Sequence, residues 1–591
     1  MTLDIRRTAV FAVFAYSFGL VAACDDDENH DDDYYNARIA PGGGGVSTRP
    51  SGGSAGRSGS GSSQRPDTGE AGSAPDDDDD DTDDDDSERD DAALLVEVEQ
   101  GTLRGRWASD EVRAFLGIPY AEPPLAELRW TAPTQPTPWK KGSVRDATKY
   151  SARCAQLAPS LFHATEDTSE DCLYLNVWAP SVSSRVTLPV VVWIHGGDHL
   201  SGSASDQVPS GDGKYYDGST LASHGVVVVS FNYRLGALGF LAHPELDAER
   251  SPFGNQGLRD QVAALTWVHD NIDQFGGDRA NVTLVGQGSG AADVCMHVVS
   301  PLSQGLFQQA VGQSGGCTVY QPEPADLTRN TQAWVAAVGC DDAKDQLECL
   351  RTTSLDKLLK AAGDKRAFVP VVDGEFLPEQ PRQLYRLNRF EPVPYVIGWS
   401  SDDGALFNAD FKSVDSQDDY HAVLQKQFPD LSLETLCEIY PHDEFGDTPE
   451  GYRKVLAHLY GDAFVRCVVE DTAERASDGA ADVYLYQFAV PADGNGIGPS
   501  HAAEVGYLFG TEPKLSAKQR TVGKLMQSYW VDFARNGYPD RNEDLPAWPP
   551  LSSKDESRMQ FAFESKLVGD TNKQACEYWR SVYNARFPAQ P

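Results

Sequence analysis

The chain has 591 residues, and its 40% hydrophobic content is enough to form one large core or several smaller ones. A net charge of -39 argues against nucleic acid and against anionic membrane surfaces as partners.

The first segment, residues 1–23, has Arg6 and Arg7 before a short apolar run. This pattern predicts a secretory signal peptide, because the run is too short for a transmembrane helix. The sequence VAAC at residues 21–24 resembles a bacterial lipobox, in which cleavage before Cys24 leaves a lipid-modified cysteine. An ordinary signal peptide followed by a chance cysteine is the alternative. The lipobox predicts an exported protein, lipid-anchored to a bacterial membrane on its extracytoplasmic side.

Residues 24–91 form a segment of low complexity. From residue 25 to residue 91 it holds 22 acidic and 5 basic residues, with a Gly/Ser-rich stretch between the acidic parts. Such a composition cannot bury enough apolar area to offset the entropy of ordering, so we expect a disordered acidic tether. Loose binding of divalent cations by the Asp runs is the functional alternative, but the spacing of an EF-hand loop is missing.

From residue 92 to residue 591 the composition is that of a globular domain. Residues 190–194 and 226–229 are continuous apolar runs between Pro, Gly and Ser, which predicts strands buried on both faces of a sheet. Residues 258–275 place Val262, Leu265, Val268 and Ile272 at helical spacing, so we expect this stripe to pack on the sheet. The pattern favours an α/β fold with a large, mostly parallel central sheet and helices on both faces.

Residues 281–292, with the sequence NVTLVGQGSGAA, predict a strand, a sharp turn and a helix. This is typical of a nucleophile elbow, which lifts one side chain above the sheet edge with a helix N-terminus behind it. In such an elbow the apex is Ser, with Gly two residues away on each side. Here the flanking residues are Gly286 and Gly290, and the apex is Gly288.

Several motifs outside the elbow resemble those of the type-B carboxylesterase family, the α/β-hydrolases that include the cholinesterases and the non-enzymatic neuroligins. They are FLGIPYAEPP at 115–124, EDCLYLNVW at 170–178 and GNQGLRDQ at 254–261. In that family an Asp like Asp278 lies ten residues before the nucleophile, and a Ser-Pro pair like that at 300–301 begins twelve residues after it. Both spacings point to Gly288. A frame with Ser289 at the apex would put Gln287 and Ala291 where the turn needs glycine.

The resemblance also implies the rest of a catalytic site. The sequence HGGD at 195–198 matches the oxyanion loop, so the amide donors would be those of Gly197, Asp198 and Ser289. Asp198 departs from the family's glycine and brings a carboxylate to a place where negative charge develops during ester hydrolysis. The alternative is that its side chain turns to solvent.

Two further motifs supply the acid and the base that the resemblance implies. GWSSDDG at 398–404 puts Asp403 at the triad acid, and GPSHAAE at 498–504 puts His501 at the base. The order of elbow, acid and histidine is that of α/β-hydrolases. We expect Asp403 and His501 to be hydrogen-bonded to each other near Gly288.

The resemblance implies three disulfides, Cys154–Cys172, Cys340–Cys349 and Cys467–Cys576. Cys295, Cys317 and Cys437 have no family partner, and Cys295 is expected to be a buried free thiol. The segment from Cys154 to Cys172 contains no Trp, so the cation-π seat that cholinesterases have in this loop is missing, and choline substrates are not expected.

The residues leave three functional hypotheses open. The first is a surface-tethered carboxylesterase-like domain without ordinary serine-esterase activity, which binds a small ester-like or hydrophobic ligand or a protein partner and needs no cofactor. The second is an ester hydrolase with a non-standard nucleophile or a water activated by His501. The third is a pocket in which Asp198, His199, Asp403 and His501 hold a metal, although no metal-ligand spacing supports it.

Overall fold

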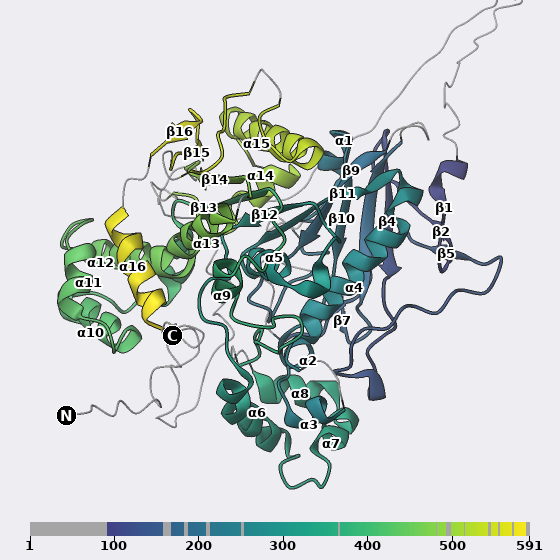
Figure 1. Ribbon diagram of the computed structural model, residues 1–591, viewed down its shortest axis with the longest axis horizontal. Coiled ribbons are helices and arrows are strands. Elements are labelled where there is room, and N and C mark those ends of the chain that lie inside the picture. The colour runs from purple at the N-terminus through teal and green to yellow at the C-terminus, as the bar shows by residue number, and fades with distance from the viewer. Residues whose placement is uncertain are drawn as a thin grey trace, which may run out of the picture. The chain divides into compact units, whose positions relative to one another are not determined.

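The computed structural model describes residues 91–157, 167–181, 187–207, 213–249, 253–363, 367–479, 481–491, 498–512, 514–541, 545–552, 556–569 and 573–586 (Figure 1). The predicted signal peptide, Cys24 and the predicted tether apart from Asp91 lie outside these residues. Within them, no helix combines the length and the apolar character that crossing a bilayer requires.

An 11-stranded sheet runs through the described part of the chain, in the order β16-β15-β14-β13-β12-β11-β9-β10-β8-β4-β3. The strands from β10 to β15 pair in parallel, while β16, β8, β4 and β3 pair antiparallel to their neighbours. The strands of this sheet are β3 (Arg106–Trp107), β4 (Val112–Pro119), β8 (Tyr174–Pro180), β9 (Leu188–Ile194), β10 (Val227–Phe231), β11 (Gly277–Gln287), β12 (Gln309–Gln313), β13 (Tyr395–Ser400), β14 (Val483–Phe488), β15 (Arg558–Phe561) and β16 (Lys566–Val568).

Two small sheets accompany the large one. The first joins β1 (Leu95–Val98), β2 (Gly101–Arg104) and β5 (Val144–Asp146), and the second joins β6 (Arg153–Cys154) to β7 (Thr168–Ser169).

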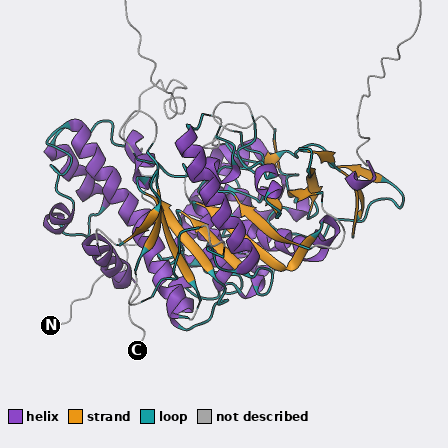
Figure 2. Ribbon diagram, turned by 90° about the horizontal axis from the view of Figure 1, so that it is seen from above, coloured by secondary structure: helices purple, strands orange, loops and turns teal. Residues whose placement is uncertain are grey.

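Helices cover both faces of the large sheet, as Figure 2 shows. The helices are α1 (Ser219–Ser223), α2 (Gly236–Gly239), α3 (Pro244–Ala248), α4 (Gln256–Asn271), α5 (Ser289–Val299), α6 (Pro324–Val338), α7 (Gln346–Thr352), α8 (Leu355–Ala362), α9 (Pro381–Arg386), α10 (Gln417–Gln427), α11 (Leu433–Ile439), α12 (Pro449–Gly461), α13 (Cys467–Asp478), α14 (Val505–Phe509), α15 (Ala517–Asn536) and α16 (Lys573–Arg586). Short 3-10 turns are η1 (Asp91–Leu94), η2 (Ala126–Leu128), η3 (Ile272–Phe275), η4 (Pro301–Ser303) and η5 (Asp403–Ala409), and a π-helix, η6 (Asp462–Arg466), joins α12 to α13.

Strand β9 shows why the sheet needs helices on both sides. Val190 and Val192 belong to a core cluster with residues of α4, α5 and α13, whereas Val191 and Trp193 belong to another with residues of α1, α14 and α15. Because side chains alternate across a strand, a continuous apolar run buries both faces. The predicted α/β-hydrolase architecture is therefore confirmed. A third cluster joins α10–α12 to α16, which lie together in Figure 1.

The predicted helix over residues 258–275 is α4 followed by the 3-10 turn η3. Leu265, Val268 and Ile272 are fully buried against the sheet, as the stripe predicts. Val262 is different, because it is only partly buried and lines a cavity on the outer side of α4. It lies at the edge of the stripe, where it still packs against the core cluster with part of its surface.

The three predicted disulfides, Cys154–Cys172, Cys340–Cys349 and Cys467–Cys576, are present. The expectation of a free thiol at Cys295 is wrong, because Cys295 on α5 is bonded to Cys317, with Cα atoms 5.6 Å apart. The two cysteines lie on different elements, α5 and the loop after β12, and only the parallel pairing of β11 with β12 brings these elements together. Cys437 is free.

Candidate active site

The turn between β11 and α5 has Gly288 at its apex. This residue has φ 60° and ψ -123°, a conformation that L side chains rarely adopt. Its N–H donates to the carbonyl of Gln313 at 2.8 Å, and its carbonyl accepts from the amides of Ala291 and Ala292 at 3.1 Å. Strand β12 and the first turn of α5 therefore hold the apex on both sides.

The glycines two residues away on either side make this turn possible. A Cβ at Gly286 would lie 2.3 Å from the carbonyl oxygen of Gly290, and a Cβ at Gly290 would lie 2.4 Å from that of Ile194. No side chain fits at such distances, because the helix passes directly against β11 and β9. The packing of α5 against β11 and β9 therefore requires both glycines, and Gly288 lies midway between them at the start of α5.

His501 and Asp403 lie together beside this apex. Nδ1 of His501 is 2.8 Å from Oδ1 of Asp403, and Oδ2 of Asp403 accepts from the Ser400 amide at 2.9 Å. A Cβ at Gly288 would lie 2.9 Å from Nε2 of His501, so the imidazole faces the apex. The structure thus brings together three residues that are far apart in the sequence.

The other ring nitrogen of His501 has a partner that the sequence does not suggest. The carboxamide nitrogen of Gln287 is 2.9 Å from Nε2 of His501. In the neutral imidazole, Nδ1–H donates to Asp403 and Nε2 accepts from Gln287. Burial lowers the pKa of His501, but the hydrogen bond and the charge of Asp403, with smaller contributions from Glu504 and Asp198, outweigh it, so the pKa is raised.

Glu504 is a further residue that sequence reasoning missed, although it lies in the same motif as His501. It is fully buried, and its two oxygens accept from Gln313 at 3.2 Å and from the hydroxyl of Ser400 at 3.1 Å. Burial raises the pKa of Glu504, and the nearby charge of Asp403 raises it further. The carboxyl sits behind the His501–Asp403 pair, joined to Asp403 through Ser400. Its signal in the sequence is a carboxyl three residues after the histidine.

The loop after β9 forms one side of the site. Gly197 has φ 113°, and a Cβ there would lie 2.1 Å from the carbonyl oxygen of Ser201, so this position needs glycine. Asp198 has φ 57° although it is not glycine, and its side chain is exposed. It lines the same cavity as Gly288, Ser289 and His501. Asp198 therefore reaches solvent without leaving the site.

The elbow cavity, as we call this space, has a volume of about 260 Å³. Its lining includes Asp198, His199, Asp403 and His501, and it is largely apolar, with side chains such as Met296, Val319, Phe407, Phe464 and Val468. Nε2 of His199 is bonded to Asp293 at 2.7 Å, so it is not shared with Asp403 and His501. Among the described residues, no group of three or more His, Cys, Asp or Glu side chains is placed to hold a metal ion.

The sequence was also compared with known proteins. The sequence model of the carboxylesterase family matches residues 92–579. Pyrethroid hydrolase Ces2a of Mus musculus is 32% identical over 527 residues, covering 83% of this chain and 91% of that protein. Acetylcholinesterase of Bungarus fasciatus is 32% identical over 535 residues (82% and 86%), and pyrethroid hydrolase Ces2e of Rattus norvegicus is 33% identical over 506 residues (79% and 85%). With its α/β-hydrolase sheet and an elbow, an acid and a histidine in the family's order, this chain belongs to the carboxylesterase family.

Proposed function

We propose that this protein is a carboxylesterase-family member without ordinary serine-esterase activity, which uses the fold to bind a ligand or a partner. Gly288 carries the proposal. In the family's mechanism, the residue at the apex supplies the hydroxyl that forms the acyl intermediate. A glycine has no side chain, so the elbow has no group for His501 to activate.

The hydrogen bond from Gln287 supports the same proposal. A general base needs a free lone pair directed at the proton that it removes. In neutral His501 this lone pair lies on Nε2, which already accepts from Gln287 at 2.9 Å. Deprotonation of a hydroxyl or a water would first have to break this hydrogen bond.

Asp198 adds an electrostatic argument. Ester hydrolysis passes through an oxyanion that backbone amides stabilise. A carboxylate beside those amides repels the developing charge. The same carboxylate, an exposed group in the lining of a mostly apolar cavity, suits the binding of a neutral or positively charged molecule that is not hydrolysed.

The proposed setting is the outer side of a bacterial membrane. Cys24 in its lipobox-like sequence would carry the lipid, and residues 24–91 would act as the tether. The four disulfides favour an oxidising compartment outside the cytoplasm. A surface-tethered domain can then bind a small ester-like or hydrophobic ligand, or adhere to a protein partner.

Labelling with a fluorophosphonate tests the proposal, because this probe reacts with the activated serine of serine hydrolases. The purified full chain should remain unlabelled under conditions that label an ordinary carboxylesterase completely. It should also leave short-chain aryl esters intact, with and without a chelator.

Ester hydrolysis by another route is the second candidate, because the relatives named above are hydrolases and because two serine side chains, Ser289 and Ser314, line the elbow cavity. Stoichiometric labelling at either serine would contradict the proposal of a domain without serine-esterase activity and would favour this candidate. Turnover without labelling would point to an activated water, and turnover lost on chelation would point to a metal.

A further inference from the structure

A second histidine–aspartate pair, His199 with Asp293, lies beside the elbow cavity. Nε2 of His199, in the loop after β9, is 2.7 Å from Oδ1 of Asp293 on α5. Asp293 is fully buried, and its other oxygen accepts from the side-chain amide of Gln261 at 2.6 Å. A buried carboxylate is stable only when donors satisfy its oxygens, and here both oxygens have one. His199 is therefore held by a side chain that belongs to the core.

A chain of buried hydrogen bonds behind Asp293 fixes where each hydrogen lies. Because the amide of Gln261 donates to Asp293, its carbonyl oxygen is the acceptor for Nε2–H of His297, 2.8 Å away. Nδ1 of His297 then accepts from the hydroxyl of Ser303 at 2.6 Å. Burial lowers the pKa of His297 to about 4, so this ring is neutral and carries the single hydrogen that the chain requires. Asp293 is thus left as an acceptor, and the hydrogen between it and His199 lies on Nε2 of His199.

The remaining ring nitrogen of His199, Nδ1, has its lone pair available. Nδ1 forms no hydrogen bond with the described residues, and it is not among the buried polar atoms of this part of the chain that lack one, so solvent reaches it. The side chain is 8% exposed and lines the elbow cavity. By contrast, Nε2 of His501 already accepts from Gln287. The elbow cavity thus contains a hydrogen-bond acceptor in a fixed position that the His501–Asp403 pair does not use.

The charges that line the elbow cavity favour a cation. Among the described residues that line it, none is Lys or Arg, whereas Asp198 and Asp403 both contribute to the lining. Asp403 is bonded to His501, and Asp198 is exposed. Burial lowers the pKa of His501, and Asp198 is one of the carboxylates that reverse this effect, so its charge acts inside the cavity. An ammonium group would be attracted there, and a carboxylate would be repelled.

The size and the walls of the cavity limit the rest of the ligand. Its volume of about 260 Å³ is below the roughly 300–1,000 Å³ typical of sites for drug-sized molecules. The rings of Phe407 and Phe464, whose centroids are 6.2 Å apart, form part of the wall, which we call the aromatic wall. One ring or a short aliphatic chain can pack against it and remove apolar surface from water.

We infer that the elbow cavity binds a small primary amine with an apolar tail. One N–H of the ammonium group donates to Nδ1 of His199, the carboxylate of Asp198 attracts its charge, and the tail packs against the aromatic wall. An ammonium group has three donors and no acceptor, which suits a neutral imidazole beside a carboxylate. The inference rests on the proposed function, a site that binds without catalysis, and names the class of ligand for it.

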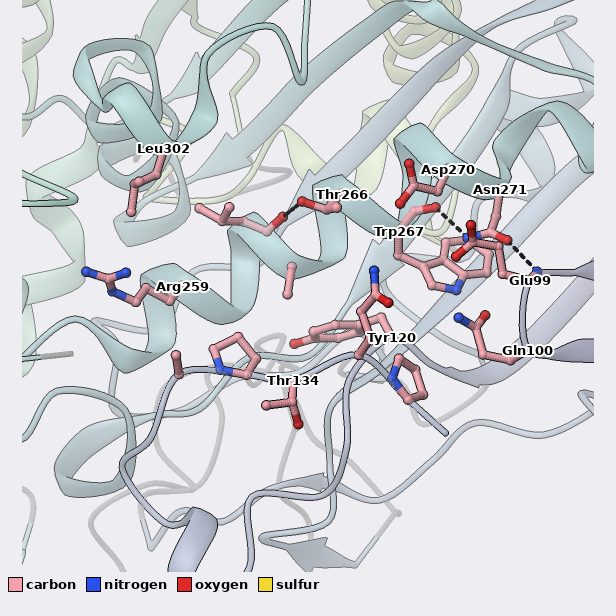
Figure 3. Close-up of a pocket in the computed structure, with 16 residues that line it drawn as sticks. Glu99, Gln100, Tyr120, Thr134, Arg259, Thr266, Trp267, Asp270, Asn271 and Leu302 are labelled. Atoms are coloured by element: carbon pink, nitrogen blue, oxygen red, sulfur yellow. Dashed lines mark hydrogen bonds between the residues drawn. The ribbon is translucent and has the colours of Figure 1, made fainter. Parts of the chain in front are cut away.

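A second cavity, of about 340 Å³, must be distinguished from the elbow cavity (Figure 3). It lies beside α4 and shares no lining residue with the elbow cavity. Glu99 and Asp270 are acidic and line it, so an amine could also approach them. Asp270 therefore serves below as a control for Asp198.

Calorimetric titration of the full chain tests the inference with four probes that share one ring and a two-carbon chain. 2-Phenylethylamine carries charge and N–H donors, trimethyl(2-phenylethyl)ammonium carries charge without a donor, 2-phenylethanol carries a donor without charge, and 3-phenylpropionate is an anion. We expect 2-phenylethylamine to bind most tightly, the quaternary compound about 10-fold more weakly because it lacks one hydrogen bond, and 3-phenylpropionate not at all. Added salt should weaken the binding of 2-phenylethylamine and not that of 2-phenylethanol.

A double variant tests the hydrogen bond to the imidazole. His199→Phe/Asp293→Ser removes both members of the pair, so no buried charge is left without a partner, and the serine hydroxyl can still accept from Gln261. The affinities for 2-phenylethylamine and 2-phenylethanol should fall about 10-fold, whereas that for the quaternary compound should not change. His243→Phe is the matched control, since His243 is a buried histidine outside the elbow cavity.

Asp198→Asn tests the charge and leaves the core untouched, because this side chain is exposed. It should weaken both cations and leave the affinity for 2-phenylethanol unchanged. Asp270→Asn, in the cavity beside α4, should change none of the affinities. If Asp270→Asn weakened the amine and Asp198→Asn did not, the amine would bind in the other cavity and the inference would be wrong.

Equal affinities of the wild type for the amine and the quaternary compound would also overturn the inference, as would the absence of 2-phenylethylamine binding at millimolar concentration. Fluorophosphonate labelling tests the proposed function separately. A labelled protein that still binds 2-phenylethylamine through His199 would contradict the proposed function only. An unlabelled protein that does not distinguish the probes would overturn this inference only.

Discussion

The backbone at Gly288 has a conformation that costs about 1–3 kcal/mol for a residue with a Cβ. Glycine avoids this strain, and without a side chain at the apex His501 comes close enough for a Cβ there to lie 2.9 Å from Nε2. A serine at this position would therefore push His501, which is held by Asp403 and Gln287. If catalysis has been lost, as we propose, the site has since become adapted to glycine.

A restoration experiment at two residues follows from this geometry. Gly288→Ser supplies a hydroxyl, but Asp198 still repels the oxyanion, and the loss of one oxyanion donor alone typically costs about 10²- to 10³-fold in rate. Asp198→Gly alone supplies no nucleophile. We expect no activity from Asp198→Gly, a trace from Gly288→Ser and clear turnover of aryl esters only from the double variant, measured as kcat/KM.

Adding Gln287→Ala to the double variant should raise the turnover again, because it frees Nε2 of His501. Gln309→Ala is the matched control, since Gln309 is a buried glutamine on β12 outside the elbow cavity. A folded triple variant that stays inert would show that the site has changed beyond these residues. If Asp198→Gly abolished an activity of the wild type, Asp198 would itself take part in that activity. Our interpretation of Asp198 as a carboxylate that repels the oxyanion would then be wrong.

At the scale of elements, the Cys295–Cys317 disulfide ties α5 to the loop after β12. That loop includes Ser314, Gly315 and Gly316, which line the elbow cavity. The bond therefore holds the helix behind the elbow against one wall of the cavity.

Removal of this disulfide tests its contribution. For a sequence separation of 22, loop-closure entropy predicts that Cys295→Ala/Cys317→Ala lowers the free energy of unfolding by about 3 kcal/mol. Cys467→Ala/Cys576→Ala, with a separation of 109, should lower it by about 5 kcal/mol. Urea unfolding of the two variants measures both values. An unchanged midpoint for the first variant would mean that packing alone holds α5 in place.

At the scale of the whole molecule, His501 should make stability depend on pH. Its pKa is raised in the folded state above the value of about 6.5 in the unfolded chain. Its contribution is thus complete below that value and is lost as the pH rises through the folded pKa. The stability difference between wild type and His501→Gln should be larger at pH 5.5 than at pH 8.5, measured by urea unfolding.

His224 provides a control, because its effect on the pH dependence of stability should have the opposite sign to that of His501. Partial desolvation lowers the pKa of His224, an otherwise exposed residue, and the charges of Arg535 and Lys524 lower it further. Wild type should therefore lose stability relative to His224→Gln as the pH falls below about 6.5. If both variants showed the same change of stability with pH, the two pH effects could not be assigned to His501 and His224 individually.

The proposed anchor is also a property of the whole molecule. In a bacterial host, Cys24→Ala should move the protein from the detergent-soluble membrane fraction to an uncleaved or soluble form, because the lipid can no longer be attached. Immunoblots of the fractions measure this. If wild type and variant fractionate alike, Cys24 is not lipidated.

Much of the architecture can be predicted from the sequence, because it depends on local patterns. The apolar run at 190–194 predicts a strand buried on both faces, and β9 is buried on both faces. The two glycines on either side of Gly288 are needed by the turn, since a Cβ at either would collide with backbone. The family's motifs place Asp403 and His501, and these residues are indeed 2.8 Å apart.

Other features were decided by the tertiary structure alone. The hydrogen bond between Gln287 and His501 joins residues 214 positions apart, and the Cys295–Cys317 bond depends on the pairing of β11 with β12. Val262 follows the helical period and packs against the core cluster, yet it is only partly buried because it also lines a cavity. A periodic pattern shows which side of a helix is apolar, but what lies against that side depends on how distant segments pack. The sequence by itself therefore determined the elements and the glycines of the elbow turn, and packing decided the partners of Gln287 and Cys295 and the cavity beside Val262.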